Sequence, residues 1–243
     1  MTASASALSA GTLLDGRVRY DQPRDGYRTG LEPVLLAATV PAAPGQRVLE
    51  AGTGSGAGLL CLLARLPNLV ATALELDPAA ASVARHNLVA NGHTVAVHEG
   101  DVAAAGRLGP VDHAFANPPW FDPAGTPPGT ASRRTAKHLT AEGLTPWIAG
   151  LSQAVVGRGT LSLILPAALL SPALASLDRV GFGRVTLLPF WPRAGLPAKL
   201  LVVQARRGRA SAVLLPGLVL HDGSDFSAEA SRVLRDGDAL PLG

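Results

Sequence analysis

Short apolar runs alternate with longer amphipathic stretches along most of the chain, which predicts strands that alternate with helices. This alternation is typical of a doubly wound parallel sheet with helices on both faces. The strands are predicted at 48–51, 70–76, 94–99, 111–116, 160–165, 182–190, 200–205 and 213–220. The helices are predicted at 57–66, 78–90, 141–156, 167–180 and 227–234.

The last two long strands, 182–190 and 200–205, follow one another with no helical pattern between them. Strands joined in this way pair antiparallel, whereas parallel neighbours need a long crossover. We therefore predict an α/β, Rossmann-like fold with a mostly parallel seven-stranded sheet, an antiparallel last strand and a short C-terminal extension at 208–243.

The composition fits one globular domain over residues 1–243, because 47% of the 243 residues are hydrophobic. No apolar run reaches the roughly 18 to 20 residues that span a bilayer, and residues 1–11 lack the basic start of a signal peptide. The single cysteine, Cys61, excludes an internal disulfide, and the six histidines show no metal-ligand spacing. We expect a cytoplasmic protein without a metal site. Its pI near 9.6 is compatible with an anionic partner.

A glycine-rich turn follows the first predicted strand and opens the next helix. It reads Glu50-Ala51-Gly52-Thr53-Gly54-Ser55-Gly56. Glycines let the backbone approach a ligand closely, and the following helix points its first amides at that ligand. The spacing also matches a dinucleotide-binding turn, which leaves an oxidoreductase as an alternative. Glu50 favours S-adenosylmethionine, because its carboxylate would attract the methionyl ammonium and repel a pyrophosphate.

Two acids follow the next two predicted strands. Glu75 comes 25 residues after Glu50, where a carboxylate can accept both ribose hydroxyl protons. Asp101 can accept a hydrogen bond from the adenine amine, or it can cap the next short helix. Their neighbours Leu76 and Val102 belong to the same expected cofactor site.

A second motif, Asn117-Pro118-Pro119-Trp120, follows the fourth predicted strand, 61 residues after Gly56. The Asn117 side-chain oxygen and the Pro118 carbonyl can accept the two N–H groups of a planar amine. The prolines fix φ and stiffen this geometry, and Trp120 offers a face for a flipped base. Taken alone the tetrapeptide could be a simple turn. Together with the glycine turn it indicates methyl transfer to a nitrogen on an sp2 centre.

With both motifs in this order, the chain resembles the bacterial tRNA adenine-N6 methyltransferases, class I enzymes that modify the adenine beside the anticodon of a valine tRNA. The resemblance extends over nearly the whole chain, on residues 22–30, 33–38, 48–56, 87, 91–92, 117–120, 199–207 and 218–221. It implies that the N-terminal segment, residues 1–45, lies over the methionyl end of the cofactor. The residues that would line that side are Tyr27, Arg28, Thr29 and Gly30.

The predicted loop 117–140 carries three basic residues that suit phosphate contacts, Arg133, Arg134 and Lys137. They could equally form a solvated face. A second basic run, near the C-terminal end of the last long strand, consists of Arg206, Arg207 and Arg209.

The expected reaction is methylation of the N6 amine of an adenine in RNA, most simply tRNA, by a monomer or homodimer. Two alternatives keep the chemistry and change the substrate to a protein glutamine amide or a DNA adenine. A further alternative is a module that binds S-adenosylmethionine without catalysis.

Overall fold

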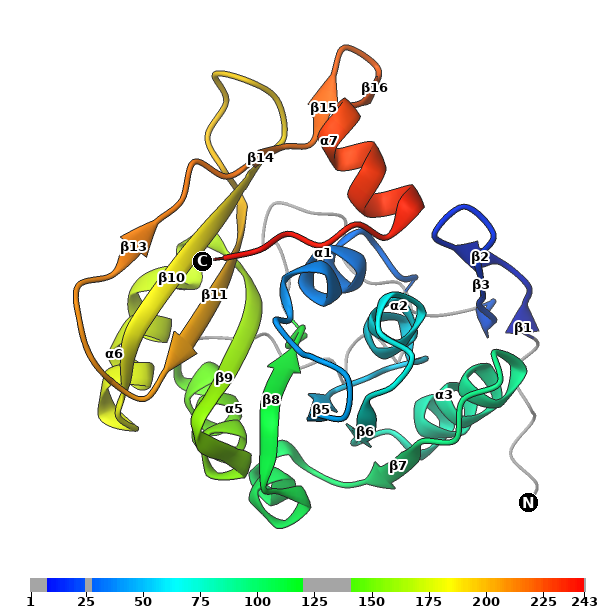
Figure 1. The fold of residues 1–243 in the computed structure, drawn as a ribbon, viewed down its shortest axis with the longest axis horizontal. Helices are drawn as coiled ribbons and strands as arrows, with labels where there is room; N and C mark the ends of the chain where they lie inside the picture. Colours follow the sequence, from blue (N-terminus) through cyan, green and yellow to red (C-terminus); the bar gives the residue numbers. More distant parts are fainter. Residues whose placement is uncertain (1–7, 25–27, 120–140, 243) are drawn as a thin grey trace.

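The computed structural model describes residues 8–24, 28–119 and 141–242, and Figure 1 shows them as a central twisted sheet with helices on both faces. The buried apolar residues form two clusters, one on each side of this sheet. Among the described residues, no helix is long and apolar enough to cross a membrane.

Seven long strands form the centre of the sheet in the spatial order β7-β6-β5-β8-β9-β11-β10. Their bounds are β5 (Arg47–Ala51), β6 (Val70–Glu75), β7 (Ala96–Glu99), β8 (Val111–Ala116), β9 (Val155–Pro166), β10 (Phe182–Trp191) and β11 (Leu200–Arg206). Neighbours are parallel, except that β11 runs antiparallel to both β9 and β10. The mostly parallel sheet with an antiparallel last strand is therefore confirmed.

The helices divide between the two faces according to which cluster they bury. The first face carries α1 (Glu32–Thr39), α2 (Ala57–Arg65), α3 (Pro78–Ala90), α7 (Ala228–Ser231) and the π-helical turn η3 (Arg232–Asp236). The second face carries η1 (Val102–Leu108), α5 (Ala141–Ala154), η2 (Ala167–Leu169) and α6 (Leu170–Arg179). The α2 and α3 helices begin where the sequence predicts them. Asp77 caps α3 by accepting a hydrogen bond from the Ala79 amide at 2.9 Å.

The junction between α5 and β9 differs from the prediction of a helix to residue 156 and a strand from residue 160. The helix ends at Ala154 and the strand begins at once, with Val155 paired to Val111. The pairing shifts register between Val111 and His113, and a Cβ at Gly159 would lie 2.2 Å from the Asp112 carbonyl. The glycines here therefore form an irregular strand against its neighbour rather than a break before it.

The single strand predicted at 213–220 is wrong. The structure has two short strands instead, β13 (Val213–Leu214) and β14 (Leu218–Val219), which pair with β10 beside the equally short β12 (Gly208–Arg209). Pro216 lacks an amide hydrogen and Gly217 has φ +86°, so the chain turns between them.

Both terminal segments pack on the first face. The N-terminal strands are β1 (Leu8–Ser9), β2 (Thr12–Leu13), β3 (Val18–Arg19) and β4 (Gln22–Pro23), in the antiparallel pairs β1–β4 and β2–β3. The C-terminal extension adds the hairpin β15 (His221–Asp222) and β16 (Asp225–Phe226). After η3 it returns to α1, where the Leu240 amide donates to the Ala38 carbonyl at 2.8 Å.

Candidate active site

The parallel strands bring the predicted site residues to one edge of the sheet. Ala51, the last residue of β5, is paired with Leu74 of β6 on one side and with Ala116 of β8 on the other. Gly52 and Asn117 are the next residues after β5 and β8, so both motifs emerge at the same level from neighbouring strands. The carboxyl edge of an open α/β sheet is where ligands bind in such folds.

The glycine turn, residues 52–56, has a backbone that only glycine adopts readily. Gly52, Gly54 and Gly56 have φ of +65°, +55° and +91°. The amides of Gly52 and Thr53 both donate to the Leu74 carbonyl, at 2.7 and 3.2 Å. A Cβ at Gly54 would meet no atom within 4 Å. The turn is therefore tied to β6 on one side and open on the other.

Glu50 lies behind this turn, with 4% of its surface exposed. Its Oε2 accepts hydrogen bonds from the Thr53 hydroxyl and, at 3.0 Å, from the Leu59 amide. A Cβ on Gly58 would overlap the other oxygen, Oε1. Both oxygens thus face the first turn of α2. Burial raises the pKa of Glu50 to about 8, although the bonds from Thr53 and Leu59 oppose that rise.

Glu75 connects the glycine turn to the end of β6. Its Oε2 accepts from the Gly54 amide at 2.8 Å, and its Oε1 accepts from the Asp77 amide at 2.9 Å. The side chain of Leu76 beside it is 63% exposed. A half-buried carboxylate and an exposed apolar side chain therefore lie together beside the turn.

Asp101 caps η1, since its carboxylate accepts a hydrogen bond from the Ala103 amide at 2.9 Å. The helix-cap alternative is therefore confirmed, and its bond to an adenine amine stays a prediction. Val102 is half-buried against the second-face cluster. The Gly100 amide donates to the Glu75 carbonyl at 2.9 Å, which keeps this loop next to β6.

Asn117 is half-buried, Pro118 is buried and Pro119 is exposed. The amide oxygen of Asn117 is inaccessible to solvent and has no hydrogen-bond partner among the described residues. Leaving a buried polar group unpaired costs about 1 to 3 kcal/mol. Such an acceptor at the carboxyl edge of the sheet indicates a donor that arrives with a ligand.

The N-terminal segment is joined to the glycine turn through Tyr20. The Tyr20 hydroxyl is 2.6 Å from the Thr29 hydroxyl and lies near the Ser55 side chain. The Thr29 amide donates to Gln22 Oε1 at 3.2 Å, while Arg28 and Gly30 are exposed. The segment thus lies against the turn, and its expected place over the methionyl end of the cofactor stays a prediction.

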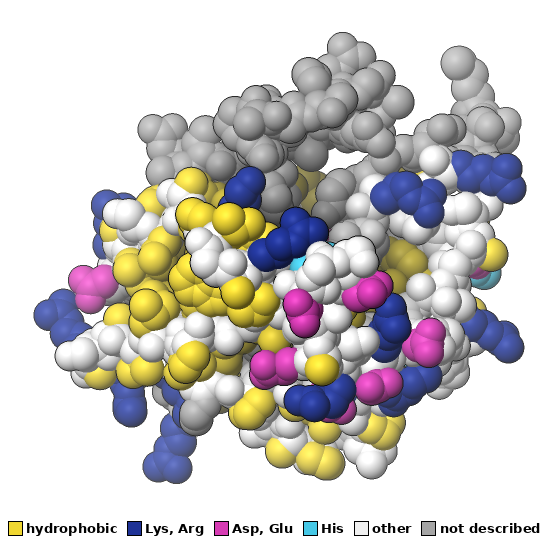
Figure 2. All heavy atoms as spheres, turned by 90° about the horizontal axis from the view of Figure 1, so that it is seen from above, with side chains coloured by type: hydrophobic (Ala, Val, Ile, Leu, Met, Phe, Trp, Pro, Cys, Tyr) yellow, Lys and Arg dark blue, Asp and Glu magenta, His cyan; other side chains and the backbone are white. Residues whose placement is uncertain are grey.

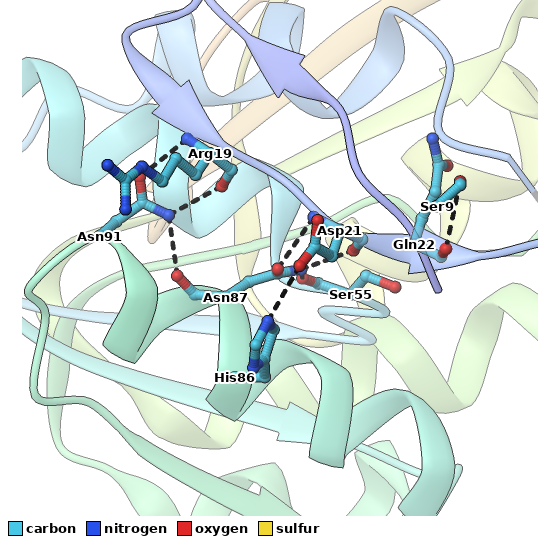
Figure 3. A network of polar contacts seen from close by, with 8 residues as sticks. All are labelled: Ser9, Arg19, Asp21, Gln22, Ser55, His86, Asn87 and Asn91. Carbon is cyan, nitrogen blue, oxygen red and sulfur yellow. Dashed lines mark hydrogen bonds and ion pairs between the residues drawn. The ribbon is translucent and has the colours of Figure 1, made fainter. Parts of the chain in front are cut away.

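Two asparagines of α3 hold this segment in place (Figure 3). The Asn87 side chain donates to the carbonyls of Asp21 and Ser55 at 2.8 and 2.9 Å, and it accepts from the Asp21 amide at 3.0 Å. Asn91 exchanges two similar bonds with the backbone of Arg19. The sequence gives no signal for these contacts, because the partners are 32 to 72 residues away along the chain.

Sequence reasoning also missed Trp147 of α5. A Cβ at Gly52 would lie 2.6 Å from the edge of its indole ring, so this ring packs directly on the first glycine of the turn. An aromatic residue on an amphipathic helix gives no signal that distinguishes this contact from ordinary core packing.

The second basic run is at the opposite edge of the sheet. Because β11 is antiparallel, Arg206 at its end is paired with Arg184 near the start of β10. Arg207 donates to the Ser152 carbonyl at 2.8 Å and covers the Phe182 ring at 4.7 Å.

Seen from above, the face in Figure 2 carries a broad hydrophobic area on one side and interspersed basic and acidic side chains on the other. The remaining predicted residues, Tyr27, Trp120, Arg133, Arg134 and Lys137, lie outside the described residues.

Comparison with known proteins gives a family match for residues 33–144, to the model described as methyltransferase small domain. A tRNA1(Val) (adenine(37)-N6)-methyltransferase of Serratia proteamaculans is 36% identical over 155 residues, 59% of this chain and 56% of that protein. The enzyme of the same name from Actinobacillus succinogenes is 32% identical over 156 residues, 62% of this chain and 66% of that protein. The chain thus spans less than two thirds of these relatives, and the similarity is shorter than the nearly complete resemblance expected from the sequence.

Solved structures show the fold. A predicted O-methyltransferase from Agrobacterium tumefaciens is 24% identical with a TM-score of 0.68, covering 86% of this chain and 98% of that one. A methyltransferase from Pyrococcus furiosus is 18% identical with a TM-score of 0.57, covering 79% and 89%. The architecture is that of the class I methyltransferases.

Proposed function

We propose that this chain, which has the class I methyltransferase fold and carries a methyltransferase small domain at residues 33–144, methylates the N6 amine of an adenine in RNA. The methyl donor is S-adenosylmethionine and the RNA is a tRNA. One observation carries the proposal: the buried, unpartnered amide oxygen of Asn117 lies one strand away from the glycine turn. The substrate class rests on the names of the curated relatives.

The sheet edge fits S-adenosylmethionine, which when bound supplies an electrophilic methyl group on a sulfonium sulfur. The open backbone at Gly54 lets a ligand approach closely. The oxygens of Glu75 each hold one amide and keep a free lone pair for a ribose hydroxyl. The exposed Leu76 side chain offers an apolar contact to the adenine ring. Asp101 and Val102 complete the proposed adenine side.

The remaining cofactor residues act through the shape of the turn. Glu50 and Thr53 hydrogen-bond each other beneath it, and Ala51, Gly52 and Gly56 set its backbone path. Glu50 was expected beside the methionyl ammonium, but both of its oxygens face the first turn of α2, so we propose that it supports the turn instead. Thr29 lies against the turn through Tyr20, and Arg28 and Gly30 flank it.

The chemistry of the target amine assigns the roles in the tetrapeptide. The lone pair of an adenine amine is delocalised into the ring, so the nitrogen is a weak nucleophile. The Asn117 oxygen and the Pro118 carbonyl accept its two N–H groups, which favours a tetrahedral nitrogen with its lone pair aimed at the methyl group. The prolines hold these acceptors before the substrate arrives. Trp120 is proposed to stack on the flipped base.

The proton is lost late. Methyl transfer would form the nitrogen–carbon bond as the bond from that carbon to the sulfonium sulfur breaks, with S-adenosylhomocysteine as the leaving group. The nitrogen would then be cationic, and one of its protons would pass to solvent. A cationic amine is acidic, so neutral acceptors such as the Asn117 oxygen suffice and a strong base is not required.

The test is transfer of labelled methyl from S-adenosylmethionine to bulk tRNA, with nucleoside mass spectrometry of the product. The expected product is N6-methyladenosine. Asn117→Ala should lower kcat by roughly 100- to 1,000-fold, as does the loss of a positioned polar group in other active sites. Full activity in this variant would show that the proposed mechanism is wrong.

The matched control is Asn68→Ala, an exposed asparagine before β6, which should keep full activity. If labelled methyl appears in a protein glutamine or in DNA and none appears in tRNA, the proposed substrate is wrong, while the proposed methyl transfer to a planar amine stands. Protection against thermal unfolding by NAD and not by S-adenosylmethionine would indicate the oxidoreductase alternative.

A further inference from the structure

A second buried acceptor lacks a partner. Glu32 is the first residue of α1, and its Oε2 is inaccessible to solvent with no hydrogen-bond partner among the described residues. A carboxylate oxygen removed from water is more costly to leave unpaired than a neutral amide. This oxygen is therefore suited to a cationic or strongly donating group.

The position of Glu32 relative to the glycine turn follows from the packing of α1 on α2, which lie side by side in Figure 1. At their carboxyl ends, Arg65 of α2 donates to the carbonyls of Ala37 and Val40 at 2.9 and 2.8 Å. Just before their amino ends, the Tyr20 hydroxyl hydrogen-bonds the Thr29 hydroxyl at 2.6 Å and lies near the Ser55 side chain. The two helices are therefore parallel neighbours.

The amino end of α2 is the glycine turn, so Glu32 at the amino end of α1 lies beside that turn. The direction of its side chain is also defined. A Cβ at Gly30 would lie 2.2 Å from Glu32 Oε2, so the carboxylate folds back over the Gly30 backbone. The unpaired oxygen therefore faces the stretch from Thr29 to Gly30, next to the turn.

Glu50 is the other carboxylate near this end of the turn, and its situation differs. Its Oε2 already accepts two hydrogen bonds, and both of its oxygens face the first turn of α2. Of the two carboxylates, Glu32 is the one with an unused buried acceptor.

We propose that Glu32 binds the ammonium group in the methionyl part of S-adenosylmethionine through a charge-assisted hydrogen bond. The inference rests on the proposed function and names a specificity residue within its cofactor site. The ammonium provides the donor and the positive charge that the buried Glu32 oxygen lacks.

Calorimetric binding of two nucleosides tests this assignment. S-adenosylhomocysteine carries the amino-acid group, whereas 5′-methylthioadenosine has the same adenosine and thioether without it. Glu32→Gln should weaken S-adenosylhomocysteine binding roughly 10- to 100-fold, which is the range for a hydrogen bond to a charged group. Binding of 5′-methylthioadenosine should stay within twofold of the unmodified chain.

Two control variants accompany it. Glu229→Gln, an exposed residue of α7, should change neither affinity. Glu50→Gln should change both affinities by a similar factor, because Glu50 supports the turn. Without ligand, Glu32→Gln should melt at or above the temperature of the unmodified chain, since it replaces a carboxylate whose buried Oε2 has no hydrogen-bond partner among the described residues.

Three outcomes would overturn the inference. Glu32→Gln could weaken the binding of both nucleosides equally, or it could weaken the binding of neither. Alternatively, Glu50→Gln could be the variant that weakens S-adenosylhomocysteine binding and leaves 5′-methylthioadenosine binding unchanged. If the unmodified chain binds neither nucleoside, the proposed function itself fails. In the first three cases the proposed function stands.

Discussion

Hydrogen-bond saturation separates two kinds of polar residue at the sheet edge. Glu75 and Asp101 lie at the surface of the site, yet their carboxylates already hold backbone amides. Asn117 and Glu32 each keep one buried oxygen without a hydrogen-bond partner among the described residues. The first pair builds the loops, and the second pair is positioned to meet a ligand's donors.

Gly52 gives a prediction at this scale, because two independent constraints meet there. Its φ is +65°, and a Cβ would lie 2.6 Å from the Trp147 ring. Gly52→Ala should lower the free energy of unfolding by more than the roughly 1 to 2 kcal/mol of left-handed backbone strain. It should also weaken S-adenosylhomocysteine binding at least tenfold. Urea denaturation and calorimetry measure the two effects.

Gly45 is the matched control, since its φ is +83° and a Cβ there would meet nothing within 4 Å. Gly45→Ala should lower the free energy of unfolding only by the cost of left-handed backbone strain, and it should leave S-adenosylhomocysteine binding unchanged. Equal destabilisation by the two substitutions would contradict the role assigned to Trp147.

At the scale of elements, the site is assembled where several carboxyl ends and helix starts meet. β5, β6 and β8 end at one level, and α1 and α2 begin beside the turn. The N-terminal strands join this group through Asn87 and Asn91 of α3, which bind their backbone, and through Leu14, Val18 and Tyr20, which pack in the first-face cluster. The segment is thus held by side-chain contacts rather than by strand pairing with the central sheet.

Asn87→Ala should therefore release that segment. The substitution removes three hydrogen bonds from a side chain that is 1% exposed, at a cost of about 2 to 4 kcal/mol in the free energy of unfolding. Limited proteolysis should cut the variant near residues 8–24 faster than the unmodified chain, and S-adenosylhomocysteine binding should weaken.

Asn68→Ala again serves as the control and should leave both measurements unchanged. Proteolysis at the same rate in the Asn87 variant would mean that core packing of Leu14, Val18 and Tyr20 holds the segment without the asparagine.

At the scale of the whole molecule, the buried Glu50 makes global stability depend on pH. Its pKa rises from 4.5 to about 8 on folding, mainly through desolvation. Between these values the unfolded chain loses a proton that the folded chain keeps, so stability is full below about pH 4.5 and falls as pH rises through 8.

The free energy of unfolding is measured by urea denaturation at several pH values for the unmodified chain and for Glu50→Gln. The difference between the two chains isolates the contribution of Glu50, because all other titratable groups are present in both. The stability of the unmodified chain relative to the variant should decrease steadily from about pH 5 to pH 8 and then level off. Parallel curves for the two chains would show that Glu50 ionises in the folded protein as it does in the unfolded one.

Local patterns were enough for part of the fold. The period of apolar residues and the helix signals at Asp77-Pro78 and Asn91-Gly92 predicted α3 residue by residue. They failed at Gly157 and Gly159, read as a break, because only the neighbouring strand shows that this backbone is paired irregularly. The single strand expected at 213–220 also ran through Pro216-Gly217, a turn signal that is present in the sequence itself.

The sequence by itself determined which residue types lie at the end of each strand: a glycine turn after β5, an acid as the last residue of β6, another acid after β7, and an asparagine with prolines after β8. These are local features, so spacing along the chain reveals them. Only the tertiary structure decided which of these polar side chains already have hydrogen-bond partners within the chain. The partners of Glu50, Glu75 and Asn87 lie 3 to 66 residues away, and the unpaired oxygens of Asn117 and Glu32 become evident only when the surrounding chain is in place.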